Sequence, residues 1–340
     1  MKLILITEAP FDSVTGASFY HRRLLAAWRE AGGGVEIFAL DQPIGPDFAD
    51  RLRPDGPILL EGAAFAHARA AIPALQARGA FALIHHPTSL EPGTPEDVRQ
   101  AFKSLEREAL PGFARVIAAS EPIAGRLSAE FGVLHDRISV LVPGTDRYEC
   151  RTLNPVLPDG SPCAVLSLGT LTYRKGHDVL IRALASLHDL DWRLVIAGEL
   201  RDPDYAEGLD RLAAELGVAS RVERRGPLTG SALENAWAEA DLFALATRFE
   251  GFGMAVAEAM ARGLPVAITD GGAAGELVPT GAGIVAPVDD VAQLGKAMRR
   301  LVFSPALRAQ MGAIAWKHAR GLPHWPDQAR ALRGLALAAA

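Results

Sequence analysis

The 340-residue sequence predicts an α/β protein made of two Rossmann-like domains, each built on a parallel sheet. Two observations lead to this fold class. Short apolar runs alternate with segments of helical periodicity in both halves of the chain, and helices that cross over between strands imply parallel pairing. Residues 143–162 separate the two halves, because they are rich in Pro, Gly and Asp and lack periodicity, which is typical of a linker.

The composition is that of an ordinary globular protein, with 49% hydrophobic and 22% charged residues. A formal net charge of −5 argues against nucleic acid as a partner. The first apolar run stops at Thr7-Glu8, too early for a signal peptide, and no uninterrupted apolar window is long enough to span a membrane. Cys150 and Cys163 have no C-x-x-C spacing, so free thiols in a cytoplasmic protein are expected.

The first half predicts strands and helices in alternation. The strands are expected at 3–7, 35–40, 58–60, 81–84, 115–119 and 138–142, and the helices at 18–31, 64–77, 94–110 and 121–131. The first strand–helix–strand unit contains no G-x-G-x-x-G, so the dinucleotide-binding fingerprint is missing. A nicotinamide dehydrogenase is therefore disfavoured.

Two histidines, His85 and His86, follow the strand that begins at Phe81. The carboxyl end of a strand is where open α/β sheets place their ligands, and an imidazole there can donate a hydrogen bond to a sugar hydroxyl or a phosphate. On the residues alone, a structural loop is the alternative. No metal site is expected at the pair, because no Asp or Cys lies nearby in the sequence.

The second half repeats the alternation. Its strands are expected at 163–168, 192–197, 221–224, 241–246, 264–269 and 283–285, and its helices at 177–187, 206–216, 232–240, 252–262, 289–303 and 305–319, with a last helix at 325–337. Arg174 and Lys175 lie between the first of these strands and the first helix. A basic pair at a helix start, after a strand and a glycine, suits a diphosphate; the alternative is two solvated cations in a loop.

The stretch over 247–260 carries the strongest functional signal. An apolar strand ends before it, a turn that contains Glu250 follows, and a helix begins near Phe252. Gly251 and Gly253 let backbone N–H groups come close to a ligand, and a helix N-terminus favours anions. This turn is therefore a candidate binding loop.

Two carboxylates frame the start of that helix. Glu250 in the turn and Glu258 in the second helical turn can each accept hydrogen bonds from hydroxyl groups. The alternative is an ordinary helix with one solvated Glu, but Glu258 is flanked by small apolar residues, and a buried carboxylate needs partners. Two carboxylates beside an anion-favouring helix start suit a nucleotide sugar.

Glu250 and Glu258, in the setting RFEGFGMAVAEAMARGLPVAITDGG, resemble the E-x7-E signature of retaining glycosyltransferases of the GT-B fold, family GT4. The resemblance extends to Gly169 and to Lys175-Gly176 with the D-V-L-I run after it, and it covers essentially the whole chain. It implies two Rossmann-like domains that face each other across a cleft. The implied parts are an N-terminal acceptor-side domain over 1–150, a donor-side domain over 151–322, and a crossover helix over 323–340 that packs on the N-terminal domain.

The resemblance also implies roles for individual residues. Glu250 and His85 are the implied catalytic residues, with His86 as the competitor of His85 for the place in the cleft. The implied donor-binding residues are Gly16, Arg174, Lys175, Gly251, Phe252, Gly253, Met254 and Glu258. In this scheme the basic pair offsets the charge of the leaving diphosphate, while Glu250 with the backbone of the glycine-containing turn holds the transferred sugar and Glu258 holds the ribose.

Three positions depart from the family pattern. Ala17 and Thr170 stand where relatives usually have glycine and arginine, and Gly144-Thr145 replaces part of a Pro-Asn-Gly-Val-Asp run. Arg174, next to Lys175, is the candidate that takes over the charge missing at Thr170. Gly16 has a competing explanation as a plain turn glycine.

The implied activity is a hexosyltransferase-type transfer from a nucleotide-diphosphate sugar, such as a UDP- or GDP-sugar, to a hydroxyl acceptor. The family's usual account is a front-face substitution with retention, in which the leaving phosphate helps deprotonate the acceptor. No cofactor and no strictly required metal are expected, since Asp202-Pro-Asp204 has D-x-D spacing but falls in a predicted surface loop.

Several alternatives stay open. The acceptor is a glycan, a lipid or a small molecule, and the oligomeric state is not defined by the sequence. An epimerase of sugar nucleotides with the same fold, or a non-catalytic protein that binds them, is an alternative function. A cytoplasmic location is expected. Peripheral contact at the inner membrane face through Phe19, Tyr20, Arg22 and Arg23 is a further option, but that face of the helix is better explained as core.

Overall fold

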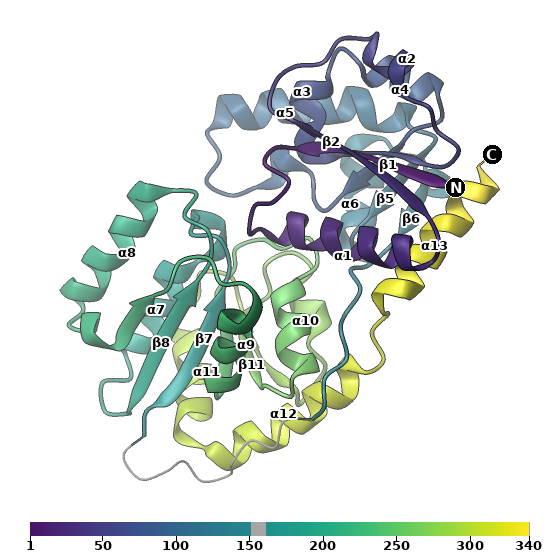
Figure 1. Ribbon diagram of the computed structural model, residues 1–340. Coiled ribbons are helices and arrows are strands. Elements are labelled where there is room, and N and C mark those ends of the chain that lie inside the picture. The colour runs from purple at the N-terminus through teal and green to yellow at the C-terminus, as the bar shows by residue number, and fades with distance from the viewer. Residues whose placement is uncertain (151–160, 340) are drawn as a thin grey trace. The chain divides into compact units, whose positions relative to one another are not determined.

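The computed structural model describes residues 1–150 and 161–339 (Figure 1). The chain divides into two compact units. Unit 1 comprises Met1–Ser13, Ala17–Gly144 and Pro323–Ala340, and unit 2 comprises Val14–Gly16 and Thr145–Leu322. Half of the predicted linker over 143–162, residues 151–160, lies outside the described residues, directly after the predicted domain boundary at residue 150.

Unit 1 contains a six-stranded parallel sheet with the strand order β2-β1-β3-β4-β5-β6. The strands are β1 (Lys2–Glu8), β2 (Gly34–Leu40), β3 (Ile58–Glu61), β4 (Phe81–Ile84), β5 (Arg115–Ala118) and β6 (Ile138–Val140). The strand order changes direction at β1: the chain first adds β2 on one side of β1 and then adds β3 on the other side. Ligands of open α/β sheets bind at the carboxyl ends of the strands near such a point.

The helices of this part of the chain connect the strands as crossovers. They are α1 (Gly16–Glu30), α2 (Phe48–Arg51), α3 (Phe65–Ala68), α4 (Ile72–Ala77), α5 (Glu96–Ala109) and α6 (Glu121–Phe131), with 3₁₀ helices η1 (Gly62–Ala64), η2 (Thr88–Leu90), η3 (Leu110–Gly112) and η4 (His135–Arg137). The prediction of one helix over 64–77 is wrong, because α3 ends before α4 begins. Pro73 lies in the first turn of α4, where its missing N–H costs nothing, whereas inside a continuous helix it would break the ladder.

The last helix, α13 (Trp325–Ala338), belongs to unit 1. The Trp325 ring packs edge-on against Tyr20 of α1 at 5.5 Å, and the Arg333 guanidinium lies 4.9 Å from the centre of the Trp28 ring. The end of the chain therefore packs on its first helix. Tyr20 is only 1% exposed, so the suggestion that its ring touches a membrane is wrong; the aromatic stacking and burial on α1 remove it from the surface.

Unit 2 contains a second six-stranded parallel sheet, with the order β12-β11-β10-β7-β8-β9. Its strands are β7 (Cys163–Leu168), β8 (Trp192–Ala197), β9 (Val222–Arg224), β10 (Leu242–Leu245), β11 (Val266–Thr269) and β12 (Gly283–Ala286). Its helices are α7 (His177–Ala185), α8 (Pro203–Glu215), α9 (Gly230–Glu239), α10 (Met254–Ala261), α11 (Val291–Phe303) and α12 (Pro305–Ala319), with η5 (Tyr173–Lys175), η6 (Ala219–Arg221) and η7 (Gly275–Leu277). The predicted α/β class with two parallel sheets is confirmed.

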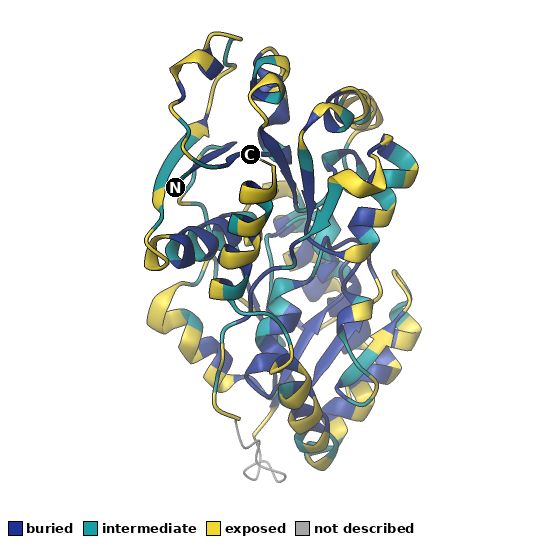
Figure 2. Ribbon diagram, turned by 90° about the vertical axis from the view of Figure 1, so that its right-hand side faces the viewer, coloured by how far each residue is buried: buried dark blue, intermediate teal, exposed yellow. Residues whose placement is uncertain are grey.

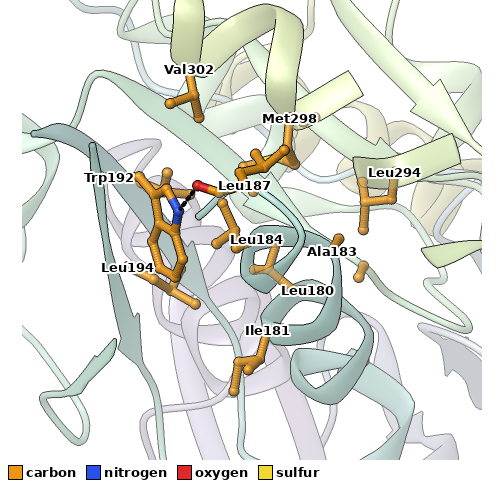
Figure 3. Packing of buried hydrophobic residues seen from close by; sticks show 14 of the residues in the cluster. Leu180, Ile181, Ala183, Leu184, Leu187, Trp192, Leu194, Leu294, Met298 and Val302 are labelled. Atoms are coloured by element: carbon orange, nitrogen blue, oxygen red, sulfur yellow. Dashed lines mark hydrogen bonds between the residues drawn. The ribbon is translucent and has the colours of Figure 1, made fainter. Parts of the chain in front are cut away.

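Both faces of the second sheet are covered by core. Alternate residues of β10 point to opposite faces, so Leu242 and Ala244 join one apolar cluster while Phe243 and Leu245 join another. Figure 3 shows the first cluster, in which α7 and α11 pack over Trp192 of β8. The indole N–H of that tryptophan donates to the Leu187 carbonyl at 3.1 Å, so its one polar atom is satisfied within the core.

Figure 2 shows that burial follows the strands and the inward sides of the helices. In the described ranges 1–150 and 161–339, no helix combines the length and the apolar character that crossing a membrane requires.

Candidate active site

Glu250 lies in the loop after β10, and the loop after β11 holds it in place. Its N–H donates to the Gly271 carbonyl at 3.0 Å, and its own carbonyl accepts from the Ala273 N–H at 2.9 Å. Gly272 has a φ of +68°, and a Cβ there would come within 2.2 Å of the Glu250 carbonyl oxygen. The glycine pair is thus required for the two loops to approach, and the approach fixes the backbone of Glu250.

The carboxylate of Glu250 is buried, with 8% of the residue exposed, and two cations face it. Lys175 Nζ lies 2.5 Å from Oε1, Arg174 Nη1 lies 3.4 Å from the same oxygen, and Thr247 Oγ1 donates to it at 3.1 Å. Burial alone would raise the pKa of the Glu250 carboxyl, but Lys175 and Arg174 hold that pKa below its ordinary value. Glu250 is therefore an anion in a closed, positively charged setting.

The two cations come from a loop that is joined to the Glu250 loop along the backbone. The Arg248 N–H donates to the Arg174 carbonyl at 2.8 Å, and the Arg174 side chain donates back to the Phe249 carbonyl at 2.8 Å. Gly176, at the start of α7, has a φ of +64°, and a Cβ there would lie 1.8 Å from the Ala246 carbonyl oxygen. Only glycine allows this contact between the loops after β7 and β10.

A second ion-pair network braces the same two loops. Arg248 donates to both carboxylate oxygens of Asp178 at 3.0 and 2.8 Å and to Asp289 at 2.8 Å, and its guanidinium lies 3.8 Å from the centre of the Tyr173 ring. Burial opposes ionisation of Asp178, but Arg248 and Tyr205 hold its pKa below the usual range. The ion pairs of Arg248 therefore hold the two loops that carry Arg174, Lys175 and Glu250, and they involve Asp178 and Asp289 instead of these three side chains.

The helix that follows, α10, begins at Met254 with Gly253 as its N-cap at a φ of +104°. The first N–H groups of a helix have no intrahelical acceptor, so the start of α10 offers donors to a ligand. Glu258 lies one turn further along α10, and 19% of its side chain is exposed. Its carboxylate is 4.0 Å from the guanidinium of Arg262, the C-cap of the same helix. Gly251, Phe252, Gly253 and Met254 are thus together at the loop that carries Glu250.

A different cluster lies in unit 1, where His85 follows β4. Its Nε2 is 3.2 Å from Nε2 of His21 on α1, and Oε1 of Glu61, the last residue of β3, lies 3.7 Å from the first nitrogen and 3.6 Å from the second. Burial, followed by the charge of Arg22, lowers the pKa of His21 to about 3, and burial, followed by the charge of His21, lowers the pKa of His85 to about 3. Both imidazoles are neutral at physiological pH.

His86 has other surroundings. Its Nε2 lies 2.7 Å from Oε1 of Glu91, so the two adjacent histidines belong to different networks. Gly16 begins α1, and a Cβ there would meet nothing within 4 Å, so no steric constraint explains a glycine at this position. Asp202 is the N-cap of α8 and accepts from the Tyr205 N–H at 2.9 Å, and Asp204 lies in the first turn of that helix. The prediction that Asp202-Pro-Asp204 falls in a surface loop is therefore wrong, because Asp202 begins a helix.

Sequence reasoning did not single out Glu61, His21 or Arg248. His21 shares the helical spacing of Leu24, Leu25 and Trp28, so its place on the inner face of α1 could have been read from the sequence. Glu61 closes the buried run of β3, where a charged residue stands out. His21, Glu61 and His85 form a group whose metal-ligating atoms lie within 4.8 Å of one another.

Known protein families and solved structures resemble this chain. Residues 154–318 match the model of the family described as glycosyl transferases group 1. The chain is 28% identical over 272 residues to a D-inositol 3-phosphate glycosyltransferase of Thermomonospora curvata, an alignment that spans 74% of this chain and 63% of the relative. The chain spans about 60 to 65% of the length of the curated relatives it matches first.

Solved structures give the fold. The sucrose-phosphate synthase of Thermosynechococcus elongatus superposes with a TM-score of 0.80 at 19% identity, over 100% of both chains. Anabaena HepE in complex with UDP-glucose superposes with a TM-score of 0.79 at 19% identity, also over 100% of both chains. The fold of the chain is thus the GT-B fold that the resemblance predicted.

Proposed function

Residues 154–318 belong to the glycosyl transferases group 1, and from this premise we propose that the chain is a retaining glycosyltransferase. It would move a sugar from a nucleotide-diphosphate sugar to a hydroxyl acceptor. The observation that carries the proposal is the buried group of Arg174, Lys175 and Glu250, in which two cations and one carboxylate come from loops at the carboxyl ends of β7 and β10.

The group is complementary to both parts of such a donor. Lys175 Nζ and the Arg174 guanidinium would bind the diphosphate oxygens, since these are the charge-assisted contacts that phosphate favours. Glu250, relieved of its contact with Lys175, would then accept hydrogen bonds from the sugar hydroxyls. The N–H groups at the start of α10 add donors for negative charge, and Glu258 would accept from the ribose hydroxyls.

The proposed reaction needs no covalent intermediate on the protein. The bond between the anomeric carbon and the phosphate oxygen breaks, the acceptor oxygen forms the new bond on the same face, and the acceptor proton passes to the leaving phosphate. Arg174 and Lys175 offset the charge that grows on the diphosphate, which is a task that a metal performs in other enzymes. We therefore propose that the transfer itself requires no metal. His85 is assigned to the site by the family resemblance, as a neutral imidazole.

Similar proteins suggest the donor class. Anabaena HepE was solved with UDP-glucose, so a UDP-sugar is the first donor to test, with a GDP-sugar as the next. The curated relatives are named for D-inositol 3-phosphate, but the acceptor of this chain stays open among glycans, lipids and small molecules.

The test is binding followed by product analysis. Calorimetry with UDP, GDP and ADP should find one nucleotide that binds the wild type and Lys296→Met, in which an exposed lysine of α11 is changed, but binds Lys175→Met at least 10-fold more weakly. NMR of the product made from the matching sugar nucleotide should show a glycoside with the donor's anomeric configuration. An altered sugar nucleotide without a glycoside would establish an epimerase instead, and binding without turnover would establish a binding protein.

A further inference from the structure

The cluster of His21, Glu61 and His85 has the dimensions of a metal site. The two Nε2 atoms and Glu61 Oε1 form a triangle with sides of 3.2, 3.6 and 3.7 Å. An ion just outside the plane of this triangle would lie about 2.1–2.2 Å from all three corners, and zinc lies about 2.0–2.2 Å from histidine nitrogen and carboxylate oxygen. The separations of the three atoms therefore match those around a single bound ion.

Hydrogen bonding among the three groups does not satisfy them. One imidazole can donate from Nε2 to the Nε2 of the other at 3.2 Å, which leaves a lone pair on the acceptor. The distances of 3.6 and 3.7 Å to Glu61 Oε1 are too long for a hydrogen bond from either ring. Within the described residues, Oε1 accepts no hydrogen bond, although the Glu61 side chain is only 4% exposed. A carboxylate oxygen thus lies near an imidazole lone pair in a buried place, an arrangement that a cation would stabilise.

Neighbouring groups hold the three side chains in this orientation. Thr7 of β1 donates its hydroxyl to Oε2 of Glu61, which turns Oε1 toward the two histidines. The Tyr20 ring packs edge-on against His85 at 4.7 Å. Metal ligands are commonly oriented by such partners, and the three ligands here come from α1, β3 and the end of β4.

We propose that unit 1 binds one divalent zinc-class metal ion through His21 Nε2, His85 Nε2 and Glu61 Oε1. Two imidazoles and a carboxylate suit zinc better than magnesium or calcium, which prefer oxygen ligands. The separations of 3.2, 3.6 and 3.7 Å also favour tetrahedral coordination, in which ligand atoms about 2.15 Å from the metal lie about 3.5 Å apart, over octahedral coordination, in which they lie about 3.0 Å apart. Of the three ligands, His85 is the most exposed, with 19% of its side chain accessible, against 2% for His21 and 4% for Glu61.

The site contains none of the unit 2 residues assigned to the donor, but it shares His85 with the residues that the family resemblance assigns to transfer. It has one consequence for that reaction, which rests on the proposed function. A metal bound to His85 would engage the imidazole that the family resemblance assigns to the transfer site, so zinc should inhibit transfer and a chelator should restore it.

The proposal is tested by titrating chelator-treated protein with Co²⁺ and recording visible absorption, which tetrahedral cobalt with nitrogen ligands makes intense. The wild type and the control His86→Ala should each bind one equivalent, and Zn²⁺ should displace the cobalt. Glu61→Gln and His21→Ala should lose at least 10-fold in affinity. Thr7→Val should lose about 10-fold, since removal of an orienting partner weakens metal binding by about 10–100-fold.

Thermal denaturation gives a second readout. A ligand that binds only the folded state raises the melting temperature, so Zn²⁺ should stabilise the wild type and His86→Ala but not Glu61→Gln. If His21→Ala does not fold, the isosteric Glu61→Gln decides the question. Absence of the cobalt bands from the wild type, or the same titration curve in the wild type and Glu61→Gln, would overturn the proposal, whatever the outcome of the nucleotide-binding and transfer assays.

Discussion

Replacing Glu250 with glutamine tests whether the carboxylate lies between the two cations as an anion. Glutamine keeps the shape of the side chain and an acceptor oxygen for Thr247, but its contacts with Lys175 and Arg174 become neutral. A hydrogen bond to a charged group contributes about 1.5–3 kcal/mol and a neutral one about 0.5–1.5 kcal/mol. Because both contacts lose their charge in Glu250→Gln, the free energy of unfolding of this variant should be lower than that of the wild type by about 1–3 kcal/mol.

Thermal denaturation at pH 7 measures this loss. For a unit of the size of Thr145–Leu322, a change of about 1–3 kcal/mol lowers the melting temperature by roughly 3–10 °C. Glu207→Gln is the matched control, because its carboxylate lies 3.6 Å from Arg211 on the surface with 72% of the side chain exposed. An exposed pair of this kind contributes less than about 1 kcal/mol, so the control should melt close to the wild type.

The stability difference between the wild type and Glu250→Gln should depend on pH. Because the pKa of Glu250 is lower in the folded protein than its ordinary value of 4.5, its contribution is present above pH 4.5 and is lost as the pH falls through the folded value. The difference in stability between the wild type and Glu250→Gln should therefore shrink below about pH 4.5. A difference that stays constant from pH 7 to pH 3 would contradict an ionised Glu250.

The variant also separates stability from function. If UDP binds through Lys175 and Arg174, the wild type must first break their contact with Glu250, whereas Glu250→Gln has no charged competitor. UDP should then bind the variant about 3–10-fold more tightly, a change of roughly 1 kcal/mol, although transfer is lost. A variant that is as stable as the wild type, or that binds UDP more weakly, would refute the reasoning.

Two further predictions concern backbone geometry and titration. Gly176→Ala should cost more than about 3 kcal/mol in urea denaturation, because its Cβ would overlap the Ala246 carbonyl, whereas Gly79→Ala, which has a φ of +72° but open space, should cost about 1 kcal/mol. In metal-free protein, His21 and His85 should show no imidazole titration by NMR above pH 5, and because their folded pKa values of about 3 lie below the ordinary 6.5, stability should fall as the pH drops from 6.5 toward 3. Titration of either ring near pH 6.5 would contradict its burial.

The sequence predicts the strands well, for a physical reason. Every strand of both sheets begins and ends within two residues of a predicted strand. The inner strands β3, β4 and β10 are buried throughout and need continuous apolar residues, whereas the edge strand β9 is largely exposed and carries Glu223 and Arg224. The prediction of one helix over 64–77 is wrong, because apolar periodicity does not show that the chain ends α3 and begins α4 with Pro73 in its first turn. Local patterns of apolar residues therefore predict where strands and helices lie, whereas a break within a helix depends on which backbone hydrogen bonds can form.

The candidate site could be predicted only in part. Arg174, Lys175 and Glu250 were each expected near a donor, but the sequence assigned them to different parts of that donor and gave no sign that they contact one another. Lys175 and Glu250 are 75 residues apart, and their contact depends on glycines that let the loops after β7 and β10 meet. Residue type shows what a side chain can bind, whereas its partner in the unliganded protein is set by the sheet order.

The histidine cluster makes the same point more strongly. No metal site was expected at His85, because no Asp or Cys lies near it in the sequence, whereas the proposed site joins residues that are distant in the sequence and close in the sheet. The strand order β1-β3-β4 places the carboxyl ends of β3 and β4 side by side, and α1 brings His21 to the same edge. Residues 21, 61 and 85 converge because the topology aligns strand ends, so candidate ligands in α/β proteins should be sought at neighbouring strand ends as well as at neighbouring positions in the chain.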